Sequence, residues 1–261
     1  MTSRDRRVDA FECRIRYDHG SQPELPASEV DRLCRFVEAK SRAWGVQICR
    51  FLGLSLERSV TITLRQGAVL SMTRGSEVVV GVGRGTVSAA LAHELVHAVA
   101  GPSPRQVYSE GLAVWVDGEL RPAGPAWPCF ELPPDRWVRQ FVEDGSLVPV
   151  AELLANPATA PSDEEGISTA ARVYLEAASL IGYVVSRTGL EGFWPYFNSG
   201  RPLAAPGRDT AVLERDWLDS VGGSITGREA RLRDAAISRL VNDGRHGLPS
   251  PPSEPALAGD R

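Results

Sequence analysis

The sequence predicts an α+β protein with a mixed N-terminal sheet, one long helix against it and a mainly helical C-terminal part. Segments rich in β-branched residues gather within the first 85 residues, and amphipathic helical segments dominate the rest. We therefore expect a single domain over residues 1–245, with an α/β part at 1–85, two helices at 86–120 and a helical part at 121–245. The Pro- and Ser-rich residues 246–261 are predicted to form a disordered tail.

Composition excludes several classes of function. The chain has 261 residues, of which 43% are hydrophobic and 24% charged, and this balance is typical of a soluble globular protein. A net charge of −4 argues against a nucleic acid partner. The sequence contains neither a stretch long enough to span a membrane nor an evident signal peptide. Its four cysteines show no close pairing, so we expect a cytoplasmic protein.

The N-terminal elements follow from two kinds of periodicity. Residues 11–17 alternate between apolar and charged side chains, which predicts a half-buried strand. Apolar residues at helical spacing then predict one long helix from about residue 28 to Gly53. The segments VTITL at 60–64 and EVVVGV at 77–82 are typical of strands.

Helices are predicted over most of the remaining chain. Thr86 or Ser88 can cap a helix that runs to Ala100, where Gly101 and Pro102 end it. A second helix is predicted over residues 106–117, followed by a proline-rich irregular connection at 121–134. The clearest later helix covers residues 169–187 and stops at Gly189.

The helix that ends at Ala100 carries the motif HExxH, formed by His93, Glu94 and His97. Residues at i and i+4 lie one turn apart on one face of a helix, so both imidazoles can bind a single zinc ion. Glu94 flanks that ion and has the position of a general base. The alternative is that the two histidines are ordinary surface residues.

Catalytic zinc usually has three protein ligands and an open fourth position, so a third ligand is expected. Metzincins supply it with a histidine shortly after the motif, but the matching positions here are Ala100 and Ser103. Glu110 is the better candidate, because the intervening prolines allow its helix to fold back. The alternative for Glu110 is an exposed helix carboxylate. Asp117 lies two turns later and is either an orienting partner of a ligand imidazole or a solvated carboxylate.

AHELVHAVAG followed by SEGLAVWVDG resembles the gluzincin zinc peptidases of the thermolysin clan, especially the bacterial peptidase MA-like proteins. The likeness extends loosely over most of residues 11–221. It implies a thermolysin-like zincin fold and a zinc ion held by His93, His97 and Glu110. The segment YLEAASLIGYV is similar to the part of related aminopeptidases where a tyrosine stabilises the oxyanion, which gives this role to Tyr174. Tyr183 in the same helix is interpreted as a packing residue.

The function expected from these residues is zinc-dependent hydrolysis of a peptide or protein substrate. The aminopeptidases' Gly-x-Met-Glu-Asn motif has no match at residues 71–85, which favours an endopeptidase over an aminopeptidase. The strand at 77–82 is either an exposed edge that pairs with an extended peptide or an ordinary core strand. Two alternatives remain: an inactive zincin-fold module that binds peptides or regulates, and a zinc hydrolase of non-peptide amides.

Overall fold

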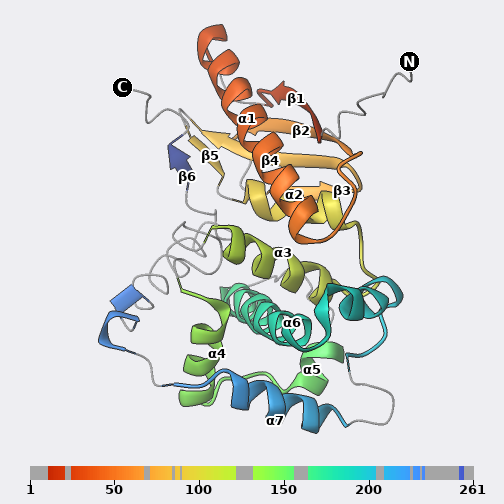
Figure 1. Cartoon of the computed structure of the whole chain (residues 1–261). Coiled ribbons are helices and arrows are strands. Elements are labelled where there is room, and N and C mark those ends of the chain that lie inside the picture. The colour runs from red at the N-terminus through yellow and green to blue at the C-terminus, as the bar shows by residue number, and fades with distance from the viewer. Residues whose placement is uncertain are drawn as a thin grey trace, which may run out of the picture.

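The computed structural model describes residues 11–20, 25–67, 71–83, 86–88, 90–121, 132–155, 164–203, 209–223, 226–229, 231–232 and 253–255. The fold is α+β: a small mixed sheet and the helix α1 form one part, and a group of helices forms the other (Figure 1). The predicted class is confirmed at this level. No described helix is both long and apolar enough to cross a membrane. Much of the predicted connection at 121–134 lies outside the described residues.

Three parallel strands, β1, β2 and β4, form one side of the sheet, and antiparallel strands extend it beyond β4. The order is β1-β2-β4-β5-β6, with β3 also paired to β4. The strands are β1 (Glu12–Asp18), β2 (Ser59–Gln66), β3 (Met72–Arg74), β4 (Glu77–Gly83), β5 (Thr86–Ser88) and β6 (Ser253–Pro255). Because β4 has β2 on one side and β3 and β5 on the other, it is an interior strand. The interpretation of residues 77–82 as an exposed edge is therefore wrong.

Two helices pack beside this sheet. The long helix α1 covers Ala27–Phe51, close to its predicted range, and lies across the sheet (Figure 1). The motif helix α2 covers Leu91–Ala100, so the prediction that Thr86 or Ser88 begins it is wrong. Both residues belong instead to β5, which pairs with the end of β4. Backbone pairing with an existing strand outweighs the capping preference of these side chains.

The second part of the molecule is helical. It contains α3 (Gln106–Leu120), α4 (Pro134–Glu143), α5 (Val150–Ala155), α6 (Glu164–Ser199) and α7 (Thr210–Ser220). Gly189 interrupts α6 with φ 69°, a conformation that glycine adopts without strain, so the predicted stop at this residue is a break between two helical segments. The predicted tail lies outside the described residues except for Ser253–Pro255, which form β6 and are not irregular.

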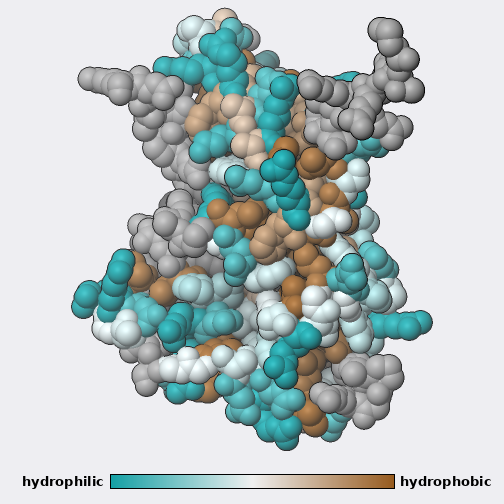
Figure 2. Space-filling view, viewed as in Figure 1, coloured by the Kyte–Doolittle hydropathy of each residue, from teal (hydrophilic) through white to brown (hydrophobic). Residues whose placement is uncertain are grey.

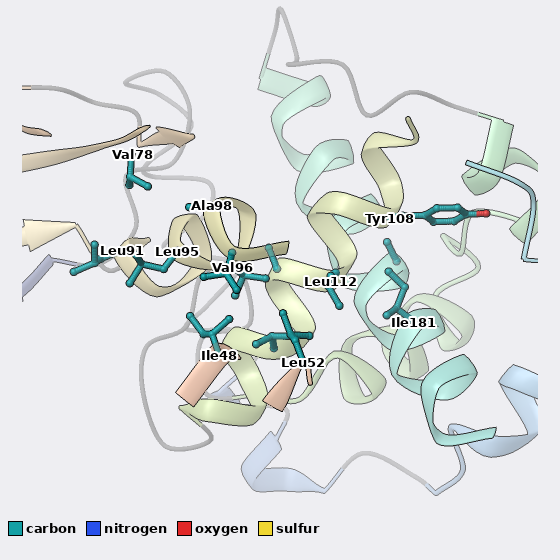
Figure 3. Packing of buried hydrophobic residues seen from close by; sticks show 14 of the residues in the cluster. Ile48, Leu52, Val78, Leu91, Leu95, Val96, Ala98, Tyr108, Leu112 and Ile181 are labelled. Atoms are coloured by element: carbon teal, nitrogen blue, oxygen red, sulfur yellow. The ribbon is translucent and has the colours of Figure 1, made fainter. Parts of the chain in front are cut away.

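A continuous core connects the two parts through α2 and α3. Figure 3 shows Ile48 of α1 and Leu52, which follows α1, together with Val96 of α2, near Leu112 of α3. These four side chains are at most 1% exposed. Figure 2 shows hydrophilic side chains over much of the outer surface and apolar ones around the middle of this face, between the sheet and the helices. Helix α2 is thus fixed from the sheet side and from the helical side.

Candidate metal centre

Helix α2 places three motif side chains at this junction. Apolar residues on its other positions are buried against α1, β4 and α3, which leaves the polar face of the helix turned to a small site. His93 is 3% exposed and Glu94 is 7% exposed. The rings of His93 and His97 meet edge to face with their centroids 4.8 Å apart. Their Nε2 atoms are 3.1 Å apart, so both imidazoles converge on one point.

Helix α3 brings Glu110 to the same point. Gly101 ends α2 with φ 80°, and the chain reverses before α3 begins at Gln106. The Oε2 atom of Glu110 lies 3.3 Å from Nε2 of His93 and 3.4 Å from Nε2 of His97. Glu110 is therefore not an exposed helix carboxylate, since its side chain is only 16% exposed and faces both histidines.

The three converging atoms suit a tetrahedral metal ion. Zinc with nitrogen and oxygen ligands at about 2.0–2.1 Å sets neighbouring ligand atoms about 3.3–3.4 Å apart. The separations here are 3.1, 3.3 and 3.4 Å, and His93, His97 and Glu110 form a group able to hold a metal ion. Two imidazoles and one carboxylate leave a fourth tetrahedral position for water or substrate.

Glu110 and the two histidines strongly influence one another's charge: the histidines lower the pKa of Glu110, and Glu110 raises the pKa of His93. Burial acts to raise the pKa of Glu110, but the charges and hydrogen bonds of His97 and His93 outweigh it and hold that pKa far below its usual range. Burial acts to lower the pKa of His93, but the hydrogen bond and charge of Glu110, followed by the charges of Glu94 and Asp117, raise it overall. The carboxylate is thus kept ionised, as a metal ligand must be.

Two further residues affect the histidines: Ser109 contacts His97, and the charge of Asp117 acts on His93. Ser109 places its hydroxyl 3.1 Å from Nδ1 of His97, a contact that can fix the ring with Nε2 toward Glu110. Asp117 is fully buried and accepts hydrogen bonds of 2.5 and 2.6 Å from Arg121, whose guanidinium lies over the ring of Trp44. Asp117 is therefore not a solvated carboxylate. The hydrogen bonds described for it go to Arg121, and its negative charge contributes to the raised pKa of His93.

Glu94 is held by a residue that the sequence analysis missed. The hydroxyl of Thr73 on β3 lies 2.6 Å from Oε2 of Glu94 and 3.0 Å from the backbone oxygen of the same residue. Thr73 stands 21 positions before Glu94 on a different element. No local sequence pattern could have paired them, because the contact depends on how β3 packs against α2.

Tyr174 of α6 lies close enough for the charges of the site to act on it. Burial, followed by the negative charges of Glu110 and Glu94, raises the pKa of its phenol, and a hydrogen bond with the Gln106 side chain partly offsets the rise. The phenol therefore keeps its proton at neutral pH and remains a hydrogen-bond donor. Tyr183, about two and a half turns further along α6, packs against the core as predicted.

Comparison with known proteins adds no relative to this description. No family model matches the chain, and no curated protein or solved structure matches it either.

Proposed function

We propose that this chain is a zinc-dependent hydrolase of peptide bonds, with an active site of the gluzincin type. The observation that carries the proposal is the convergence of His93, His97 and Glu110 at separations that fit a tetrahedral ion. In the proposed site these three residues hold the ion. When bound, zinc would polarise the substrate carbonyl and lower the pKa of a water to about 7.

The remaining groups of the site have complementary roles in the proposed reaction. Glu94 takes a proton from the attacking water and passes it to the leaving amine, so one carboxylate serves both as base and as acid. Its burial and its place one residue after His93 suit this transfer, because little water competes for the proton. Tyr174 donates a hydrogen bond to the oxyanion that forms on the attacked carbonyl.

The proposed substrate is a peptide or protein cut within the chain. An aminopeptidase needs a group that grips a free amino terminus, and residues 71–85 contain no match to the motif that supplies it in related enzymes. We also propose that the fold is thermolysin-like, because a sheet is followed by the motif helix and then by a helix with the proposed third ligand.

A peptide library tests this proposal. The purified protein is incubated with a diverse set of peptides before chelation, after chelation, and after zinc is returned, and the products are identified by mass spectrometry. We expect internal cleavage that chelation abolishes and zinc restores. Zinc-loaded protein that binds peptides but cuts none of them would contradict the proposal and favour the inactive peptide-binding module.

A further inference from the structure

The contact between Thr73 and Glu94 suggests a role beyond the motif itself. We propose that Thr73 is a positioning residue whose hydroxyl holds one carboxylate oxygen of Glu94 and leaves the other oxygen for the attacking water. This inference rests on the proposed function, because it assigns Glu94 the work of a base. Thr73 lies outside the HExxH motif, on the short strand β3.

The chemistry of the contact fixes its direction. An ionised carboxylate only accepts hydrogen bonds, so the Thr73 hydroxyl must be the donor. The distance to Oε2 of Glu94 is 2.6 Å, within the range of about 2.5–2.7 Å typical of a hydroxyl donating to a charged oxygen. The backbone oxygen of Glu94 is further away, at 3.0 Å. The single hydroxyl proton therefore has its stronger acceptor in the carboxylate.

The pairing of β3 with β4 fixes the position of Thr73 beside Glu94. Thr73 pairs with Val78 of β4, which is fully buried, and its neighbours Met72 and Arg74 are exposed on the other face. Thr73 is half-buried against α2, because successive side chains of a strand point to opposite faces. A group fixed on a strand holds its partner more precisely than one on a loop. The carboxylate of Glu94, which has several rotamers of its own, is thereby restricted.

A purely structural role for Thr73 makes a different prediction. In that case its hydroxyl would only tie β3 to α2, and its loss would lower stability without acting on the carboxylate. Thr73→Val removes the hydroxyl and keeps the shape, whereas Thr73→Ser keeps the hydroxyl. Thr63→Val on β2 is a matched control, since the structure describes no hydrogen bond of the Thr63 hydroxyl.

Kinetics on a cleaved peptide give the first readout. We expect Thr73→Val to lower kcat by about 10-fold or more, as for other groups that orient a catalytic side chain, with KM changed less than about 2-fold. Thr73→Ser should recover most of the rate, and all variants should keep the zinc content of the wild type. An active wild type whose Thr73→Val variant behaves like Thr63→Val would overturn the inference and leave the proposed function intact.

Binding of acetohydroxamic acid gives a readout that needs no turnover. This zinc-binding probe also hydrogen-bonds to a neighbouring carboxylate, so its affinity reports on Glu94. We expect Thr73→Val to weaken binding about 10-fold in the wild type and to have no effect in a Glu94→Ala background. Equal losses in both backgrounds would overturn the inference. A wild type that neither cuts peptides nor binds the probe would instead overturn the proposed function, and this inference with it.

Discussion

A half-buried carboxylate, Glu110 on α3, and a fully buried one, Glu176 on α6, lie on helices that pack against each other, yet their pKa values move in opposite directions. The pKa of Glu110 is held far below its usual range by His97 and His93. Burial raises the pKa of Glu176 to about 8. Burial acts to raise the pKa of both, so the partners decide the outcome. A buried glutamate alone is therefore no indication of a metal site.

The contacts of Glu176 explain its different character. Its two oxygens accept hydrogen bonds of 3.2 Å from the backbone N–H of Val148, and the charges of Glu214 and Glu152 oppose its ionisation. It ties the segment before α5 to α6, and no imidazole contacts it in the described part of the chain. Converging imidazoles are what separate Glu110 from this structural carboxylate.

The largest effect is expected at Glu94, which we propose to be the general base and not a metal ligand. Glu94→Gln should lower kcat by roughly 10³-fold, because the amide cannot accept a proton from water, while zinc content stays that of the wild type. Peptide cleavage and elemental analysis of the same preparations measure both quantities. Undiminished cleavage by this variant would contradict the role of Glu94 as general base.

The raised pKa of Glu176 makes the stability of the fold depend on pH. Since the pKa of Glu176 is raised to about 8 in the folded protein, the native state binds an extra proton, and stability should fall as pH rises from about 5 to 8. The loss reaches at most about 4 kcal/mol. Glu176→Gln should flatten this dependence in urea unfolding between pH 5 and 9. Identical slopes for both proteins would show that Glu176 ionises normally.

The next largest effect on catalysis is expected at Tyr174 of α6, whose phenol we propose to stabilise the oxyanion. Tyr174→Phe should lower kcat by roughly 10²-fold with little change in KM, because the phenol hydrogen bond is expected to form only as the oxyanion develops. Tyr183→Phe on the same helix is the matched control and should keep near-normal kinetics. Equal kcat values for the two variants would reduce Tyr174 to a packing residue.

The smallest effect concerns the close packing of α3 against α6 at Gly111. A Cβ added at Gly111 would lie 2.7 Å from Cδ1 of Ile181 and 2.8 Å from the backbone of Ala177, so α3 and α6 must move apart. Gly111→Ala should lower the free energy of unfolding by about 1–3 kcal/mol. Gly118→Ala on the same helix meets no atom within 4 Å and should not destabilise. Thermal or urea unfolding of both variants measures the difference.

Local periodicity accounts for what could be predicted from the sequence. HExxH fixes its own geometry, because residues four apart share a helix face, and a strand of alternating residues fixes which side is buried. The sequence also pointed to Glu110, since a short proline-containing reversal must bring a following helix back past the motif. The α+β class and most helix ranges follow from the same periodic patterns.

Contacts made only by tertiary packing could not be predicted. Thr73, Ser109 and Gln106 reach Glu94, His97 and Tyr174 from other elements, without a spacing rule that links each pair. Thr86 and Ser88 were interpreted as helix caps, but β4 offers them backbone pairing. The ion pair of Asp117 with Arg121 follows the ordinary i, i+4 spacing and could have been found in the sequence.

The zinc content of the purified protein decides whether His93, His97 and Glu110 hold a metal ion. Wild type, Glu110→Ala and Glu176→Gln are purified without chelators, and zinc per chain is measured by elemental analysis. Each variant removes one carboxylate, either Glu110 beside the two histidines or the buried Glu176. We predict about one zinc per chain in the wild type and in Glu176→Gln, and a marked loss in Glu110→Ala. A wild type without zinc after reconstitution, or a Glu110→Ala variant that keeps it, would contradict the proposed metal centre.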